Sequence, residues 1–197
     1  NDYWRGIGTY EIDLPNPTAG KKQYIEFQGA NHVATVYCNG RELGTHKGGF
    51  STFRFDLTPA MKKEGNVLTV VVTNAVSDIY PQTADFTFYG GIYRSVKLIS
   101  VPSAHFDLEY FGAPGIMVTP EIKGDNADVK VRAYTKNAED AALKFTILDG
   151  EAVVCEAEAD KNDADTVLTI NNVHLWNGRK DPFLYTLKAE LTKNGEV

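Results

Sequence analysis

The dipeptide Asn39-Gly40 constrains the fold of this chain more than any other feature. It stands between two strand-like runs, residues 32–38 and 41–46, and both of its residues tolerate a positive φ angle. This combination is the strongest short-range signal for a two-residue β-hairpin. The two runs are therefore predicted to pair as antiparallel strands.

Short strand-like runs separated by turns fill the rest of the first half. No helical pattern interrupts them beyond a single turn expected over residues 58–63. Residues 67–72 are apolar on both alternating faces, which predicts a central strand. The other runs are residues 8–14, 22–28, 50–57 and 92–101. Eight or so strands in about 100 residues predict a two-sheet β-sandwich, with jelly-roll connections.

The second half repeats this pattern and predicts an immunoglobulin-like β-sandwich, so the fold class is all-β. Its last residues, 191–197, look like a strand end and a hairpin turn whose returning strand is cut off. Such an open sheet edge favours self-association, so a homo-oligomer is one expected partner. The seven candidate strands are residues 106–111, 116–122, 128–135, 142–148, 151–157, 166–173 and 183–191.

Charge divides the chain in two. Residues 1–102 contain ten Lys/Arg against nine Asp/Glu, whereas residues 103–197 contain ten against seventeen. The shift supports two domains, 1–102 and 103–197, the second truncated at its last strand. The acidic second half argues against a nucleic-acid partner, because phosphate binding needs clustered cations.

No run of the sequence reaches the roughly 18 apolar residues of a membrane span. The first residues resemble no signal peptide. The chain also does not begin with Met, which suggests an excised piece.

The sequence contains no motif for catalysis or for metal binding. There is no Gly-x-Ser-x-Gly elbow, and the four histidines lack metal-ligand spacing. Glycoside hydrolysis needs two carboxylates across one bond, and sequence cannot place Asp78 and Asp85, which are seven residues apart. Cys38 and Cys155 are expected to be independent thiols. We therefore expect no catalytic residue, metal or cofactor in this chain.

Residues 83–94 are the best candidate for a binding loop. Asp85 lies among aromatic residues, and the chain then breaks at Gly90-Gly91, where the backbone can turn sharply. Aromatic rings can wall a pocket, and a carboxylate there can accept hydrogen bonds from ligand hydroxyls. The alternative is a solvated loop whose aromatic residues cap a core.

Several phrases of the sequence together resemble glycoside hydrolase family 2, the family of β-galactosidases and β-glucuronidases. They occur in the family's order and cover most of residues 3–102, and Leu175-Trp176-Asn177-Gly178 with residues 181–185 extends the resemblance to the second half. The phrases are residues 24–30 with 34–40, residues 46–53 leading to 55–58, residues 65–70, and Asp85-Phe86 with residues 89–94. The resemblance implies a jelly-roll sugar-binding domain, an immunoglobulin-like domain and then a catalytic barrel.

The resemblance assigns one substrate-binding residue. The family's aspartate in the Asp-Phe phrase reaches into the barrel's active site and bonds the terminal sugar, which implies this role for Asp85. The chain stops before the barrel and contains no Asn-Glu dipeptide, so neither catalytic glutamate can be carried over. The implied partners are a β-linked saccharide and the barrel of the same polypeptide, in a periplasmic or cytoplasmic bacterial enzyme.

The resemblance leaves three functions open. The first is an inactive N-terminal fragment of a retaining β-galactosidase, with β-glucuronidase as its close alternative. The second is an autonomous carbohydrate-binding module, with Trp4, Tyr80 and Phe88 as its candidate platform. The third is a purely structural pair of sandwiches. For Arg94, His46 and Trp176, structural roles are favoured: Arg94 pairing with a loop group, His46 in the core or rim, and Trp176 packing at a domain interface.

Overall fold

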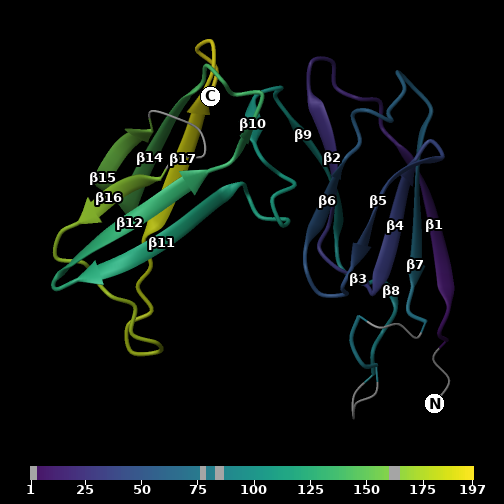
Figure 1. Ribbon diagram of the computed structural model, residues 1–197, viewed down its shortest axis with the longest axis horizontal. Helices are drawn as coiled ribbons and strands as arrows, with labels where there is room; N and C mark the ends of the chain where they lie inside the picture. Colours follow the sequence, from purple (N-terminus) through teal and green to yellow (C-terminus); the bar gives the residue numbers. More distant parts are fainter. Residues whose placement is uncertain (1–3, 76–78, 83–86, 160–164) are drawn as a thin grey trace. The chain divides into compact units, whose positions relative to one another are not determined.

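The chain folds into two compact units made of β-strands. The computed structural model describes residues 4–75, 79–82, 87–159 and 165–197 (Figure 1). The first unit comprises Asn1–Ser103 with Leu108–Ala113, and the second comprises Ala104–Asp107 with Pro114–Val197. None of the described residues forms a helix, so none forms a helix that could cross a membrane. The predicted all-β fold class is confirmed.

The larger sheet of the first unit contains the predicted hairpin. Its strand order in the described residues is β1 (Ile7–Leu14), β7 (Asn66–Thr73), β4 (Val33–Cys38) and β5 (Arg41–Lys47). Cys38 pairs with Arg41, and Asn39 and Gly40 have φ angles of 52° and 79°. The hairpin prediction is confirmed, and β7 is an interior strand as its apolar pattern predicts.

The second sheet of this unit has the order β6 (Phe53–Asp56), β2 (Lys22–Phe27) and β9 (Val96–Val101). A short ladder joins β3 (Ala30–Asn31) to β8 (Gly91–Ile92). The run predicted over residues 92–101 is thus divided between two ladders. Because β8 pairs with β3, the Gly90-Gly91 turn lies beside the residues that lead into β4.

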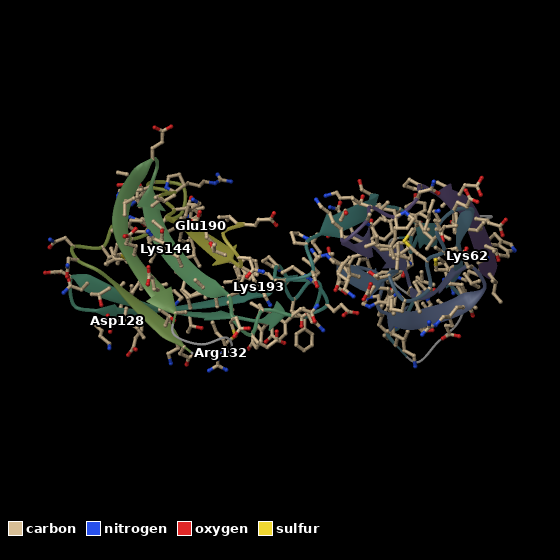
Figure 2. The ribbon with its side chains drawn as sticks, turned by 90° about the horizontal axis from the view of Figure 1, so that it is seen from above. Lys62, Asp128, Arg132, Lys144, Glu190 and Lys193 are labelled. Atoms are coloured by element: carbon tan, nitrogen blue, oxygen red, sulfur yellow. The ribbon has the colours of Figure 1, made fainter. Side chains whose placement is uncertain are left out.

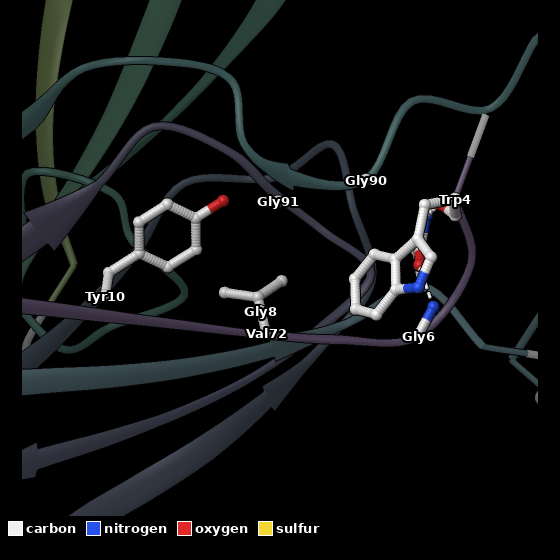
Figure 3. A pocket seen from close by; sticks show the side chains of 8 residues that line it. Trp4, Gly6, Gly8, Tyr10, Val72, Gly90 and Gly91 are labelled. Atoms are coloured by element: carbon white, nitrogen blue, oxygen red, sulfur yellow. Dashed lines mark hydrogen bonds between the residues drawn. The ribbon is translucent and has the colours of Figure 1, made fainter.

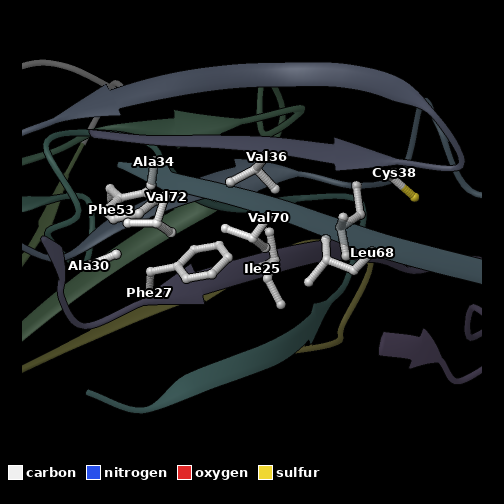
Figure 4. Close-up of a cluster of buried hydrophobic side chains, with 11 residues drawn as sticks. Ile25, Phe27, Ala30, Ala34, Val36, Cys38, Phe53, Leu68, Val70 and Val72 are labelled. Carbon is white, nitrogen blue, oxygen red and sulfur yellow. The ribbon is translucent and has the colours of Figure 1, made fainter. Parts of the chain in front are cut away.

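The core of the first unit lies between its two sheets. Alternate residues of β4 and β7 point inward, as expected for strands with one covered face. They meet apolar side chains of β2 and β6, where the rings of Phe27 and Phe53 stack with centroids 4.9 Å apart. Figure 4 shows this cluster, in which Phe27 and Val36 are fully buried. The core fixes the strands and therefore the loops at their ends.

The predicted strand over residues 106–111 is largely wrong. Only β10 (His105–Phe106) is a strand, and it pairs with β13 (Thr135–Lys136) in the second unit. Leu108–Ala113 instead belongs to the first unit. There the Arg54 guanidinium donates to the carbonyls of Leu108 and Ala113, at 2.9 and 2.7 Å. Because these carbonyls accept hydrogen bonds from Arg54 instead of from a neighbouring strand, the strand ends after Phe106.

Among its described residues, the second unit contains two three-stranded sheets that form a sandwich, in addition to the short β10–β13 ladder. One sheet has the order β11 (Ile116–Lys123), β12 (Asn126–Ala133) and β16 (Thr166–Ile170), and the other has β15 (Ala152–Ala159), β14 (Ala142–Asp149) and β17 (Thr186–Thr192). Inward-facing residues of β12 alternate with exposed ones, and Phe145 of β14 is fully buried between the sheets. This arrangement agrees with the predicted immunoglobulin-like sandwich.

Charged side chains on the outer faces of these sheets form ion pairs, and Figure 2 labels Asp128 and Lys144 among them. Asp128 accepts hydrogen bonds from Lys123 at 2.7 Å and from Thr169 at 2.8 Å, and both bonds lower its pKa. Lys144 lies 2.8 Å from Glu156 across the β14–β15 ladder. These pairs are exposed, and exposed pairs contribute little to stability.

The predicted turn near the end of the chain is present. Asn194 and Gly195 have φ angles of 53° and 81°, and Lys193 and Glu196 exchange backbone hydrogen bonds of 2.9 and 3.0 Å. This geometry is typical of a two-residue hairpin turn.

Candidate functional site

The predicted substrate-binding residue, Asp85, lies outside the described residues, as do Phe86 and Asp78. The residues on both sides of it are described: residues 79–82 precede it and residues 87–92 follow it. The candidate site is therefore built from these two flanking segments and from the parts of the first unit that they contact.

Both flanking segments are bonded to the side chain of Asn31 in β3. The Asn31 side chain is buried, with 2% of the residue exposed. The Tyr80 hydroxyl donates to its Oδ1, and its Nδ2 donates to the backbone carbonyl of Tyr89, each at 2.5 Å. A buried amide needs both kinds of partner, and here the two partners come from opposite sides of the same loop.

The neighbouring His32 is fully buried and holds the same region through further bonds. The side-chain amide of Gln82 lies 2.7 Å from His32 Nδ1. The His32 backbone N–H donates to Thr73, and its carbonyl accepts from Gly48. Burial lowers the pKa of His32 below its usual value, which favours the neutral ring. Three segments of the first unit therefore converge on the dipeptide Asn31-His32. They contain Tyr80 with Gln82, Tyr89, and Gly48.

Gly49 follows Gly48 in the loop after β5 and is buried. Its carbonyl accepts a hydrogen bond of 2.6 Å from the Tyr93 hydroxyl. A Cβ at this position would lie 2.6 Å from the Tyr80 hydroxyl and against Asn31 Oδ1. Only glycine leaves room for the bond between Tyr80 and Asn31.

We therefore expect Gly49→Ala to displace the Tyr80 hydroxyl and to lower the free energy of unfolding by about 1–3 kcal/mol, as overpacking does. Thermal melting measures the loss. Gly8→Ala is the matched control, because a Cβ at Gly8 would meet only ordinary contacts, the nearest at 3.6 Å. Equal melting temperatures for Gly49→Ala and Gly8→Ala would contradict the close fit.

Aromatic rings gather around these bonds. The Tyr80 ring lies 5.7 Å from Phe50 and 6.2 Å from Phe88, measured between centroids. Phe50 is 60% exposed and Tyr89 is 72% exposed. Aromatic faces of this kind can contact the C–H faces of a sugar ring while hydroxyls bond to polar neighbours. Of the predicted platform, Tyr80 and Phe88 thus lie together.

Trp4, the third predicted platform residue, lines a separate shallow pocket of about 150 Å³. Figure 3 shows Trp4 and Tyr10 on either side of Val72, next to Gly90 and Gly91. The pocket's one amide, Asn74, accepts from Gly6 N–H at 2.8 Å and donates to the Trp4 carbonyl at 3.2 Å. Because this amide is bonded to the chain itself and none of the described residues that line the pocket is a carboxylate, we assign no acid–base chemistry to it.

The remaining residues considered in the sequence analysis are His46, Arg94 and Trp176. His46 stacks on Phe53 with centroids 4.1 Å apart and lies 3.2 Å from the Ser51 hydroxyl, in agreement with a core or rim role. Arg94 lies over the exposed Tyr93 ring, 5.5 Å from its centroid. Trp176 is 63% exposed and lines an apolar groove of the second unit.

Sequence reasoning missed Asn31, His32 and Gln82. The only local signal was a polar pair interrupting apolar strands between Phe27 and Val36. The side-chain bonds of Asn31 to Tyr80 and Tyr89 and the contact of Gln82 with the His32 ring join residues 49 to 58 positions apart, so no short motif reveals them. In the described part of the chain no group of three or more His, Cys, Asp or Glu could hold a metal.

Comparisons with known proteins agree on one family. The family model described as "Glycosyl hydrolases family 2, sugar binding domain" matches residues 4–102, and that described as "Glycosyl hydrolases family 2" matches residues 114–197. A β-glucuronidase of Bacteroides fragilis is 33% identical over 99% of the chain. A β-galactosidase large subunit of Leuconostoc lactis is 28% identical over 94%.

A solved structure is also closely similar. The FMN-binding β-glucuronidase from Faecalibacterium prausnitzii L2-6 superposes with a TM-score of 0.92 and 39% identity, over 99% of this chain and 31% of that one. The present chain spans 30% of the length of the B. fragilis relative and 29% of the L. lactis relative. The sequence and the fold thus match a segment of about 30% of the length of these longer glycosidases.

Proposed function

Because the chain belongs to glycoside hydrolase family 2, we propose that it supports the catalytic domain of a β-glucuronidase and supplies that domain with a sugar-contacting loop. The single observation that carries the choice of substrate is the identity over the whole chain: 33% and 39% to two β-glucuronidases, against 28% to a β-galactosidase subunit. A β-galactoside, the substrate expected from the sequence, is the second candidate.

The proposal assigns the two catalytic carboxylates to a part of the protein outside residues 1–197. Hydrolysis with retention needs two carboxylates about 5–5.5 Å apart. No motif of the sequence supplies such a pair, and the family resemblance assigns both catalytic glutamates to a barrel outside residues 1–197. Asp85 is proposed to accept a hydrogen bond from a hydroxyl of the terminal sugar. The proposed partners are thus a β-linked saccharide and a catalytic barrel of the same polypeptide.

The test is hydrolysis of chromogenic β-glucuronide and β-galactoside by the complete protein. Faster turnover of the glucuronide supports the proposal, and faster turnover of the galactoside supports the second candidate. We expect Asp85→Ala to lower kcat/KM about 10- to 100-fold, because a hydrogen bond to a charged group contributes about 1.5–3 kcal/mol. Melting temperature should not change, since a charge at the ligand site does little for folding.

Glu64→Ala is the matched control for this variant. Glu64 is an exposed carboxylate in a turn of the same unit, next to the start of β7. It should leave kcat/KM unchanged. Unchanged kinetics in Asp85→Ala would reduce Asp85 to a loop residue and would leave the chain with the purely structural role.

A stand-alone carbohydrate-binding module is a further candidate, favoured by the exposed aromatic rings of Trp4, Phe50 and Tyr89. It predicts that the isolated chain binds a polysaccharide measurably in calorimetry. Loss of that binding in Phe50→Ala together with Tyr89→Ala would support it, whereas absence of binding in the parent chain would exclude it for the polysaccharides tested.

A further inference from the structure

The two segments that flank residues 83–86 are fastened to one side chain. Tyr80, on one side, donates to Asn31 Oδ1, and the carbonyl of Tyr89, on the other side, accepts from Asn31 Nδ2. From this geometry we infer that Asn31 is a positioning residue for the proposed sugar-contacting loop. The inference rests on the proposed function of that loop. The first experiment below, hydrogen exchange, can be interpreted without that function.

The chemistry of the position selects an amide. Asn31 must accept a bond from a hydroxyl and donate one to a carbonyl, and an amide does both without carrying charge. An aspartate there would keep the acceptor for Tyr80 but would face the Tyr89 carbonyl with a second acceptor. An alanine would remove the amide that bonds the Tyr80 hydroxyl and the Tyr89 carbonyl. Removing the partner of a buried polar group lowers the free energy of unfolding.

Surrounding packing leaves the Asn31 side chain little freedom to move. Gly49 packs against Asn31 Oδ1, and β3 pairs with β8, so Asn31 is held opposite Gly91. On the other side of the candidate loop, Gly90 packs against the Asn74 amide. The Asn31 amide is therefore a rigid attachment point for Tyr80 and Tyr89, the two described residues that it bonds.

Gln82 provides a second attachment on the first flank. Its amide lies against the ring of buried His32, and its backbone carbonyl accepts a bond of 3.0 Å from Arg5. Gln82 Oε1 is buried without a hydrogen-bond partner among the described residues. Gln82 thus ties the first flank to the body of the unit, whereas Asn31 is bonded to a residue on each flank, Tyr80 and Tyr89.

The functional consequence is one of placement. Catalytic and binding groups work only within a fraction of an ångström of their productive positions, and misplacement by about 1 Å can cost about 100-fold in rate. Asn31 contacts no sugar in this scheme. It acts through the residues it bonds, so its loss should impair transition-state binding without removing a contact to the substrate.

The chain offers a matched control at the other end of the same unit. Asn66 is also a buried amide, 1% exposed, and bonds Asn39 and Lys62 at 2.7 to 2.9 Å. It lies at the first residue of β7, whereas Thr73, which bonds His32, lies at the last. Asn66→Ala should therefore destabilise the unit as Asn31→Ala does, without loosening the candidate loop.

The first experiment is hydrogen exchange of this 197-residue chain, followed by mass spectrometry of peptides covering residues 79–92. Asn31→Ala should speed exchange there at least tenfold, and Asn66→Ala should leave it unchanged, at temperatures where both variants are folded. Asn31→Asp, which keeps the size of the side chain, should behave as Asn31→Ala does. Unchanged exchange in Asn31→Ala would overturn the inference.

The second experiment is hydrolysis by the complete protein. Asn31→Ala should lower kcat/KM at least tenfold, whereas Asn66→Ala should retain it. Faster exchange with unchanged kinetics overturns the positioning role if Asp85→Ala is impaired, because the loop then works without its attachment. If Asp85→Ala is also unimpaired, the proposed function of the loop fails, and the positioning role fails with it.

Discussion

Replacing Arg54 with leucine should lower the free energy of unfolding of the first unit by about 3–5 kcal/mol, because it leaves a buried carboxylate without its cation. Arg54 Nε donates to Glu26 Oε2 at 2.7 Å, and the two side chains are only 11% and 8% exposed. The nearest remaining cation, Lys97, is 3.7 Å away and 55% exposed. The variant also loses the bonds to the carbonyls of Leu108 and Ala113.

The loss should depend on pH. Burial alone would raise the pKa of Glu26, but the hydrogen bond and the charge of Arg54 outweigh burial and leave the pKa below its usual value. A carboxylate with a lowered pKa contributes stability that is complete above the unfolded-state pKa of about 4.3 and is lost as pH falls through the folded-state value. The difference between the parent chain and Arg54→Leu should therefore be full at pH 7 and shrink below about pH 4.

Denaturant-dependent hydrogen exchange measures this difference separately for peptides of each unit. Arg41→Leu is the control, since Arg41 is exposed and bonds only the Pro59 carbonyl among the described contacts of its side chain. It should change stability by no more than about 0.5 kcal/mol. A loss in Arg54→Leu that does not decrease at all between pH 7 and pH 3 would show that the carbonyl bonds, and not the pair with Glu26, provide the stability.

Phe145→Ala should remove about 3–5 kcal/mol from the second unit, as truncation of a buried aromatic side chain does. Phe145 is fully buried on β14, the middle strand of its three-stranded sheet. Strands on both sides hold its backbone in place, at Ala157 and Ala189, so the cavity cannot close easily. By thermal melting, a loss of this size in a domain of under 100 residues lowers the midpoint by ~12 °C or more.

The control for this variant is Val153→Ala on the neighbouring strand. Val153 is 59% exposed and pairs with Leu148 at the end of the ladder. We expect a change within about 0.5 kcal/mol. If Val153→Ala and Phe145→Ala lowered the midpoint equally, the packing between the two sheets would not be the source of the stability.

Local sequence patterns predicted most strands of this fold. The Asn39-Gly40 turn fixed a hairpin because only particular residues accept its backbone angles, and the double-faced apolar pattern of β7 placed it inside a sheet. The prediction for residues 106–111 was wrong because their fate depends on Arg54, more than 50 residues earlier. The local alternation of Phe106, Leu108 and Tyr110 indicates a strand, and it contains no information about the distant guanidinium that bonds this segment's carbonyls.

The candidate site was less accessible to sequence reasoning than the fold. Asp85 was named from a family resemblance and remains a prediction, since it lies outside the described residues. Asn31 and His32 read as two polar residues at the edge of a strand. Their role follows from partners in three other loops, and such convergence exists only after the two sheets have packed.

The path of the chain through its two units limits how they could be exchanged between proteins. The backbone leaves the first unit after Ser103, returns to it at Leu108 and leaves again after Ala113. A gene fusion cut at residue 102 would strip the first unit of the segment that Arg54 holds, and one cut at 114 would strip the second of β10. Recombination at either point produces a damaged module, so the pair is expected to be inherited as one piece.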